Sequence, residues 1–284
     1  MSEDPVIGVR GLRKRYGAAT AIDGIDLDIA RGEVFALLGP NGAGKTTTVE
    51  ILAGYRQRDT GAVTVLGEEP AHAASSRHWR ARIGNVLQIS GELELTVAEL
   101  VGQFAGYYPR PRDPAELIEL VGLTGMEHKR AHQLSGGQQR RLDVALGIVG
   151  RPELLFLDEP TTGFDPEARR LFWDLIRRLA ADGTTILLTT HYLPEAEAIA
   201  DRVAVIAAGR VVASGPPASL GESAAARAQV SWEAPGTGRQ MVETATPTAL
   251  VAELATALGG EVPGLTVTRP TLEDTYLDLI GASR

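Results

Sequence analysis

The chain has 284 residues, 44% of them hydrophobic, which is enough apolar material for one large domain with a small appendage. Its net charge of −8 argues against a main role in binding nucleic acid, and the lack of cysteine excludes disulfides, thiol catalysis and cysteine-ligated zinc. The start of the chain lacks the apolar core of a signal peptide, and no apolar run approaches the length of a membrane span. We therefore expect a cytoplasmic protein, for which any membrane work would need a partner chain.

The first elements along the chain are predicted to be strands. Residues 6–16 and 21–30 alternate apolar and polar side chains, as half-buried strands do. Residues 34–38 form a continuous apolar run of strand length, which leads into a glycine-rich loop and a helical pattern at 46–55. Two further strands are expected at 61–66 and 82–87.

The apolar spacing becomes helical from about Thr96. Thr96 and Glu99 have the spacing of a capping box, in which each residue satisfies a free backbone N–H of the helix start. Ser135 is a good N-cap for the helical pattern that follows it. We expect a helical insert between strands over residues 96–150, within a helical subdomain of about 90–150.

Beyond the insert, short apolar strands alternate with helices. Strand patterns cover 154–157, 184–190 and 202–215, and an amphipathic helix is predicted at 168–183. Continuous apolar strands that alternate with helices are typical of a parallel sheet covered on both faces. The sequence therefore predicts an α/β fold.

The character of the chain changes at Gly215, where two prolines follow. Residues 222–284 alternate short strand patterns with two helical patterns, the second of them at 271–281. We predict a main domain over residues 5–215 and a small C-terminal α+β accessory domain over 222–284.

A phosphate-binding loop is predicted where the apolar strand 34–38 meets the next helix. The loop matches the pattern G-x-x-x-x-G-K-S/T, in which glycines let backbone N–H groups surround phosphate oxygens. Lys45 would reach the β- and γ-phosphates, the Thr46 hydroxyl would bind Mg²⁺, and Thr47 would add a contact. An ordinary glycine-rich turn is the alternative, but it does not explain a lysine at this point. The residues of the pattern are Gly39, Pro40, Asn41, Gly42, Ala43, Gly44, Lys45 and Thr46.

Two carboxylates end the strand at 154–157. Asp158 at the strand tip can hold Mg²⁺, and Glu159 beside it can act as the general base that polarises a water for attack on the γ-phosphate. A solvated acidic pair at a strand end is the alternative. The phosphate loop upstream favours the catalytic interpretation.

The pentapeptide Leu134-Ser-Gly-Gly-Gln138 is a second candidate anion site. Two glycines follow the N-cap Ser135, so a phosphate can approach the free N–H groups and the positive end of the helix dipole. The alternative is an ordinary serine-capped helix with a flexible start. The candidate binding residues are Ser135, Gly136, Gly137 and Gln138.

Four single residues carry weaker signals. Gln88 follows a strand and could bind Mg²⁺, or it is a polar loop residue. His191 follows the strand 184–190 at the edge where ligands of a parallel sheet gather, although a lone histidine is often structural. Tyr16 could stack on an adenine or belong to the core. Asp165 could contact a neighbouring subunit or merely form an Asp-Pro turn.

Taken in chain order, these motifs resemble the nucleotide-binding subunit of an ABC (ATP-binding cassette) transporter. The match covers roughly residues 5–215, with GPNGAGKTT as the Walker A loop, LSGGQ as the signature, LLFLDE as Walker B and GFDP as the D-loop. The closing TLEDTYLDLIG resembles the C-terminal signature of ABC-2-type ATPases, as in antibiotic-resistance exporters. The resemblance implies a P-loop ATPase domain with a parallel core sheet, an N-terminal antiparallel β subdomain and a helical insert.

The resemblance also implies roles for individual residues and an assembly. Tyr16 would stack on adenine, Gln88 would form the Q-loop, and His191 would be the switch histidine that donates to the γ-phosphate. Two subunits would form a head-to-tail homodimer, in which ATP on Lys45 of one subunit is sealed by the signature motif of the other. Phe164 departs from the family, which usually has leucine in the D-loop, and the two residues after Gln88 follow no obvious family pattern.

The resulting functional prediction is an ATP-hydrolysing subunit, peripheral on the inner face of the cell membrane, that energises a separate transmembrane permease. ABC-2 resemblance favours export of a drug-like compound, a lipid or a polysaccharide. The alternative is a soluble ABC ATPase acting on ribosomes or DNA, which usually carries two cassettes or a long coiled coil. A small-molecule P-loop kinase would leave the signature and the helical insert unexplained.

Overall fold

The computed structural model describes residues 4–86, 94–220, 228–234, 236, 238–268 and 276. It divides into two compact units, residues 1–212 and 213–284. Gln88 and the two residues after it lie outside the described residues, as does the helix expected at 271–281 except for Tyr276.

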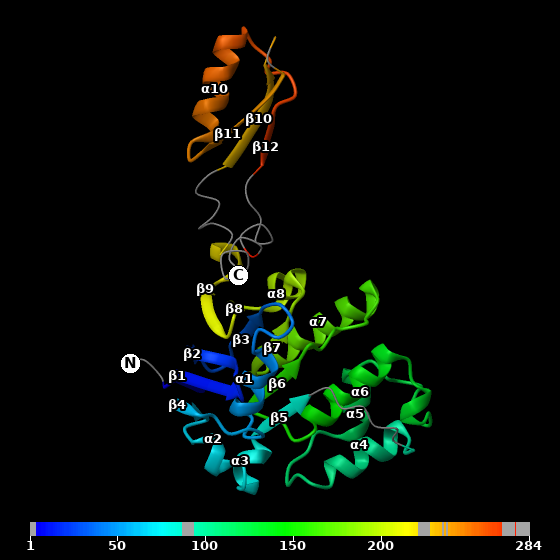
Figure 1. The fold of residues 1–284 in the computed structure, drawn as a ribbon. Helices are drawn as coiled ribbons and strands as arrows, with labels where there is room; N and C mark the ends of the chain where they lie inside the picture. The colour runs from blue at the N-terminus through cyan, green and yellow to red at the C-terminus, as the bar shows by residue number, and fades with distance from the viewer. Residues whose placement is uncertain are drawn as a thin grey trace. The chain divides into compact units, whose positions relative to one another are not determined.

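A six-stranded sheet forms the centre of the first unit (Figure 1), in the order β5-β6-β7-β3-β8-β9. The pairings β5/β6, β6/β7, β7/β3 and β3/β8 are parallel, and every residue of β3, β6 and β7 is buried. These strands are buried on both faces, which is why they consist of continuous apolar runs. The bounds are β3 (Val34–Leu38), β5 (Ile83–Val86), β6 (Leu154–Asp158), β7 (Thr185–Thr190), β8 (Arg202–Ala207) and β9 (Arg210–Gly215).

The prediction of a parallel core sheet is wrong at one edge. Only two residues, Ala208 and Gly209, join β8 to β9, and a link this short allows only antiparallel strands. Their φ angles are 48° and 75°, the left-handed conformation that tight hairpins require. The α/β class is confirmed, with a mixed rather than a purely parallel sheet.

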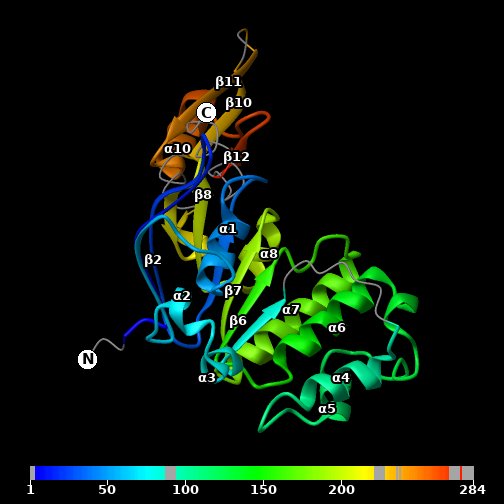
Figure 2. The same cartoon turned by 60° about the horizontal axis from the view of Figure 1, so that its bottom comes forward.

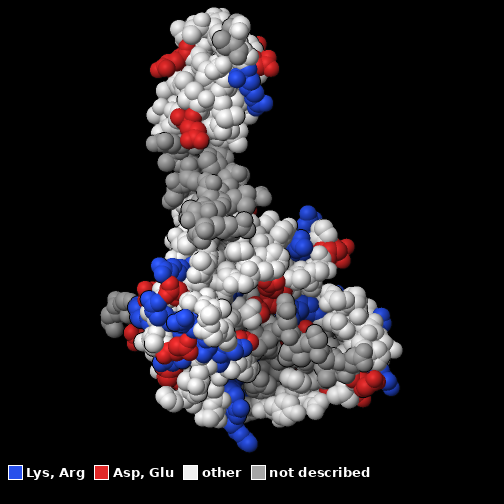
Figure 3. All heavy atoms as spheres, viewed as in Figure 1, with Lys and Arg blue, Asp and Glu red and all other residues white. Residues whose placement is uncertain are grey.

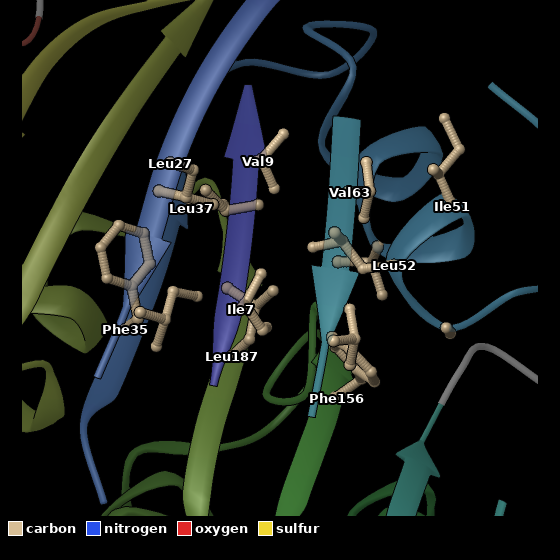
Figure 4. Close-up of a cluster of buried hydrophobic side chains, with 14 of the residues drawn as sticks. Ile7, Val9, Leu27, Phe35, Leu37, Ile51, Leu52, Val63, Phe156 and Leu187 are labelled. Carbon is tan, nitrogen blue, oxygen red and sulfur yellow. The ribbon is translucent and has the colours of Figure 1, made fainter. Parts of the chain in front are cut away.

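A second, antiparallel sheet lies against the core sheet, in the order β2-β1-β4. Its strands are β1 (Ile7–Tyr16), β2 (Ala19–Ile29) and β4 (Thr60–Val65). Apolar side chains from both sheets and from α1 (Lys45–Leu52) fill the space between them (Figure 4), among them Ile7, Val9, Phe35, Leu52 and Leu187. This cluster holds α1, and with it the phosphate loop, firmly against the sheet.

The positive charges of β1 are balanced by acids on neighbouring strands and loops. Arg10 pairs with Asp28 at 2.7 Å and Lys14 with Asp59 at 2.8 Å, and Arg13 pairs with Asp23. Figure 3 shows both signs of charge intermixed on the face it displays. Arg10, Arg13 and Lys14 therefore belong to a face on which opposite charges are paired.

Two short helices in the first unit were not predicted, α2 (Pro70–Ala73) and α3 (Arg77–Ala81). Glu69 and Ser76 cap them, each side chain accepting a backbone N–H. Trp79 of α3 is buried and its indole donates to the Val65 carbonyl at 3.1 Å. Helices this short carry too few turns for an apolar period, so only the caps could have indicated them.

The helical insert contains α4 (Val97–Ala105), α5 (Pro114–Leu120), the 3₁₀ turn η1 (Ala131–Gln133) and α6 (Gly136–Ile148). Its three α-helices lie together in Figure 2. The predicted capping box of Thr96 and Glu99 is confirmed, with both bonds present. The other long helix, α7 (Pro166–Ala181), buries Phe172, Leu175, Ile176 and Leu179, and α8 (Leu193–Ile199) follows β7.

The second unit is a small α+β domain. Its antiparallel sheet has the order β11-β10-β12, with β10 (Ala228–Ala234), β11 (Gly238–Thr244) and β12 (Thr266–Thr268). The helix α10 (Pro247–Leu258) contacts β10. It begins with proline in its first turn and ends at Leu258, and the next residue, Gly259, has a φ of 77°, which suits a helix C-terminus.

Candidate active site

The phosphate loop connects the buried strand β3 to α1, and two of its glycines are required by close packing. A Cβ at Gly39 would collide with the backbone oxygen of Ile206, and one at Gly44 with that of Ala21. Gly44 also has a φ of 104°, which L side chains rarely adopt. Gly42 has a φ of 80° but open space around it. The loop geometry therefore depends on glycine at defined points.

Lys45 lies at the start of α1 and is only 5% exposed. Its Nζ donates to the carbonyls of Gly39 at 2.8 Å and Pro40 at 3.2 Å. A carboxylate oxygen of Glu159 lies 3.4 Å from the same atom. The loop carbonyls and Glu159 thus hold the ammonium group beneath the loop.

Asp158 sits at the end of β6, where its carboxylate contacts two threonine hydroxyls. Thr46 Oγ1 lies 3.1 Å from Asp158 Oδ2 and 3.3 Å from Oδ1. Thr189 at the end of β7 donates its hydroxyl to Asp158 Oδ1, because these strands pair in parallel with Asp158 opposite Thr189. Adjacent hydroxyl and carboxylate oxygens are the ligands Mg²⁺ prefers, so the residues present fit that ion.

Glu159 has an unusual backbone conformation. Its φ is 46°, a left-handed value that is rare for a non-glycine residue and often marks a functional site. The backbone is held there because its N–H donates to the carbonyl and the hydroxyl of Thr189, at 3.2 Å and 3.0 Å. The side chain reaches His191, whose Nδ1 lies 3.3 Å from Glu159 Oε2.

The phosphate loop, Asp158 and Glu159 line one hollow of about 810 Å³, whereas Thr189 and His191 are not among its lining residues. It brings together most of the predicted phosphate-loop residues and both carboxylates, from segments more than a hundred positions apart in the sequence. Its lining is Ala21, Asn41, Gly42, Gly44, Lys45, Thr46, Thr47, Glu50, Asp158 and Glu159.

The signature motif lies at a second hollow. Ser135 caps α6, its hydroxyl accepting the Gln138 N–H at 3.3 Å while Gln138 Oε1 accepts the Ser135 N–H at 3.0 Å. The predicted N-cap is therefore confirmed, as one half of a capping box. Four of the five signature residues, those at 135–138, line a hollow of about 410 Å³ with the D-loop segment, and none of them lines the phosphate hollow.

The D-loop contacts the signature motif within the same chain. The Phe164 ring is buried, packs edge-to-face on Phe172 at 5.8 Å, and lies near Gly137. Asp165 caps α7, its carboxylate accepting the Ala168 N–H at 2.8 Å. A buried phenylalanine at position 164 thus anchors the loop to α7.

Tyr16 is not brought into the phosphate hollow. It ends β1, is 42% exposed, and its ring faces Lys14 Nζ at 5.6 Å and Arg56 Cζ at 5.3 Å. The ring therefore lies between cationic side chains and is partly open to solvent. Gln88, the other predicted Mg²⁺ ligand, lies outside the described residues.

Sequence reasoning missed two residues that support the carboxylates. Thr189 is fully buried and orients both Asp158 and Glu159. Arg140 of the signature helix donates to the carbonyls of Asp158 and Pro160, and burial lowers the pKa of its guanidinium. The threonine-rich end of the strand pattern 184–190 was a signal for Thr189, while nothing in the local sequence indicated the role of Arg140.

A phosphate loop, a strand-end carboxylate pair and a helical insert with a glycine-rich helix start together define a P-loop ATPase of the ATP-binding-cassette class. The model of the ABC transporter family matches residues 22–162. The Nod factor export ATP-binding protein I of Ralstonia nicotianae is 44% identical over 76% of this chain and 68% of its own length.

A second relative spans nearly the whole protein. The daunorubicin resistance ATP-binding protein DrrA3 of Streptomyces coeruleorubidus is 37% identical over 99% of this chain and 98% of its own. The solved structure of cbiO1 from Clostridium perfringens, part of the ABC transporter complex cbiONQ, is 30% identical, covers 77% of this chain and 91% of its own, and superposes with a TM-score of 0.69. The chain belongs to the ATP-binding subunits of ABC transporters, of the ABC-2 exporter type.

Its activity is therefore ATP hydrolysis coupled to transport, as the sequence predicted. The alternative of a soluble ABC ATPase acting on ribosomes or DNA is set aside, since the relatives are export and resistance subunits. Within the described ranges, no helix is both long and apolar enough to cross a membrane.

Proposed function

We infer that the protein works as a head-to-tail homodimer with two ATP molecules between the subunits. The observation that supports this most is the presence of two separate hollows on one chain, one at Lys45 and one at the N-terminus of α6 with Ser135. A single ATP on Lys45 occupies only the first. The signature hollow is then available to the γ-phosphate of ATP bound to the partner subunit, at the positive end of α6.

Within each site the residues divide the chemistry. Lys45 and the loop N–H groups bind the β- and γ-phosphates, and Glu159 takes a proton from the attacking water. Thr46 and Asp158, with Gln88, would hold Mg²⁺, which neutralises the charge of the phosphates. His191 donates to the γ-phosphate and is positioned by its contact with Glu159. The Thr189 hydroxyl positions both carboxylate residues, because it donates to Asp158 and accepts the N–H of Glu159.

The remaining predicted residues act at the edges of the nucleotide. Tyr16 stacks on the adenine, supported by the exposure of its ring at the end of β1. Ser135, Gly136, Gly137 and Gln138 seal the ATP of the partner, and Asp165 contacts the partner subunit close to them, since the D-loop and the signature share one hollow.

A separate permease is the proposed membrane partner, and the protein would be peripheral on the inner membrane face through it. A hollow of about 880 Å³ between the core and the helical insert, lined by apolar and aromatic residues such as Trp79, Phe104 and Leu142, supports docking of a permease segment. The names of the relatives support export of an amphipathic drug-like, lipid or polysaccharide compound.

The homodimer is tested by replacing Ser135 with arginine. Ser135→Arg should abolish ATPase activity, because a cation with a long side chain fills the signature hollow, while ATP binding to the monomer stays unchanged. Ser135→Asn is the matched control for the helix, since asparagine also caps well and should preserve the thermal stability of α6. Persistent ATPase activity in Ser135→Arg would contradict the dimer.

A further inference from the structure

One guanidinium joins the D-loop to the turn that carries His191. Arg169 of α7 donates from Nη2 to the Phe164 carbonyl at 3.2 Å. Its Cζ also lies 4.4 Å from the centroid of the Tyr192 ring, the distance of a close cation–π contact. Phe164 directly precedes Asp165, and Tyr192 directly follows His191. The side chain thus touches the immediate neighbours of two predicted functional residues.

Both ends of this bridge are held in place. On one side the Tyr192 N–H donates to Thr190 Oγ1 at 2.9 Å, and the Glu195 N–H donates to the Tyr192 carbonyl at 3.1 Å. On the other side the Phe164 ring packs on Phe172. Because both contact partners of Arg169 are fixed, a displacement of the D-loop is expected to move the guanidinium and the ring stacked on it.

The guanidinium itself has little freedom to leave. Its Nε is buried and donates to none of the described residues, so the group is held by its Nη2 bond, its ring contact and charge. The carboxylate of Glu195, 1% exposed, is the nearby opposite charge. Arg169 is half-buried and Tyr192 is 37% exposed, so the contact lies at the surface, with the buried Glu195 carboxylate beneath it.

We propose that Arg169 is a positioning residue for hydrolysis, which transmits the contact between the D-loop and the partner subunit to the turn that presents His191 to Glu159. The inference rests on the proposed head-to-tail dimer. It assigns Arg169 no contact with nucleotide. A lysine cannot replace it, since only the planar guanidinium stacks on a ring and donates sideways to a carbonyl at the same time.

The test compares ATPase kinetics of Arg169→Ala, Tyr192→Ala, the double variant and Tyr192→Phe, with Arg178→Ala as control, an exposed arginine farther along the same helix. Arg169→Ala and Tyr192→Ala should each lower kcat about tenfold and leave the KM for ATP within about twofold. The double variant should be no worse than either single one, because both break the same contact. Tyr192→Phe keeps the ring and should keep kcat.

Dimer formation separates this inference from the function it rests on. In a Glu159→Gln background, ATP should produce a dimer on gel filtration with or without Arg169→Ala. A failure to dimerise with Arg169 intact would contradict the proposed function. Dimers that form normally, with Arg169→Ala turning over like Arg178→Ala, would overturn this inference alone. Additive losses of kcat in the double variant would also overturn it. So would equal losses of kcat in Tyr192→Phe and Tyr192→Ala. If Arg169→Ala fails to fold, this comparison of the two Tyr192 variants decides between the outcomes.

Discussion

Glu159 and His191 are in direct contact, with Glu159 Oε2 lying 3.3 Å from His191 Nδ1. The other oxygen of the same carboxylate lies 3.4 Å from Lys45 Nζ. One side chain therefore links the phosphate loop to the strand end of β7. This arrangement places a carboxylate between Lys45 and His191, the two residues that we propose contact the γ-phosphate.

Glu159→Gln should bind ATP, dimerise and fail to turn over. Glutamine keeps the shape of the side chain but cannot accept a proton, so kcat should fall by about 10²- to 10⁴-fold. Phosphate release measures turnover, and nucleotide titration should give an unchanged affinity. Glu153→Gln is the control and should turn over normally, because Glu153 directly precedes the first residue of β6 and lies at the opposite end of the strand from Glu159. Near-normal turnover in Glu159→Gln would remove this residue as the base.

Thr189→Val should remove the hydroxyl that positions both Asp158 and Glu159. Valine keeps the volume but loses the hydroxyl that donates to Asp158 and accepts the Glu159 N–H. We expect a loss of about 1–3 kcal/mol in the free energy of unfolding and a fall of more than about tenfold in kcat. Thr185→Val, in the same strand, removes a buried hydroxyl that accepts the Gly32 N–H at 2.9 Å.

The two valine variants should lose similar stability, measured by denaturant unfolding. Only Thr189→Val should lose Mg²⁺-dependent ATPase activity, since Thr185 lies at the far end of the strand. Equal activity in both would mean that the Thr189 hydroxyl serves the fold and not the site.

Gly44→Ala should damage the phosphate loop more than Gly42→Ala. Both glycines have left-handed φ values, which cost an alanine about 1–2 kcal/mol. At Gly44 the added methyl group also collides with the Ala21 backbone, while at Gly42 it meets open space. The free energy of unfolding and the affinity for ATP should fall clearly further in Gly44→Ala than in Gly42→Ala. Equal losses in the two variants would show that backbone strain alone, and not the collision, causes the damage.

The pH dependence of stability should report the buried Glu195. Burial raises the pKa of its carboxyl above the ordinary 4.5, although Thr190 and Arg169 oppose the shift. The folded state then binds the proton more tightly than the unfolded state, so this group lowers stability as the pH rises above about 4.5. Glu195→Gln removes that dependence. The stability of the variant relative to the wild type should therefore rise across this window, and a constant difference would contradict the raised pKa.

The sequence predicted the parts of the site that are contiguous. Residues 39–46 carry their own pattern, and the carboxyl ends of parallel strands meet at one edge, so Asp158 and Glu159 could be expected near Lys45. The bond from Thr189 to Asp158 could not be predicted, because it depends on which strands are neighbours and on their register.

Other features depended on tertiary context in the same way. Tyr16 is not brought into the phosphate hollow, and its cationic neighbour Arg56 comes from a distant segment. The antiparallel edge strand β9 follows a two-residue turn. The first turn residue, Ala208, has a positive φ although it is not glycine, so the sequence did not indicate the turn there.

Mixing two inactive variants tests the central claim, that each ATP site is built from two subunits. Monomers of Glu159→Gln and Ser135→Arg are combined before ATP is added, and phosphate release is measured. In a mixed dimer one site pairs an intact Glu159 with an intact signature motif, so equal mixing should restore about a quarter of the wild-type activity. If each chain carried a complete site, neither variant would gain anything from the other, and a mixture as inactive as its components would contradict the account.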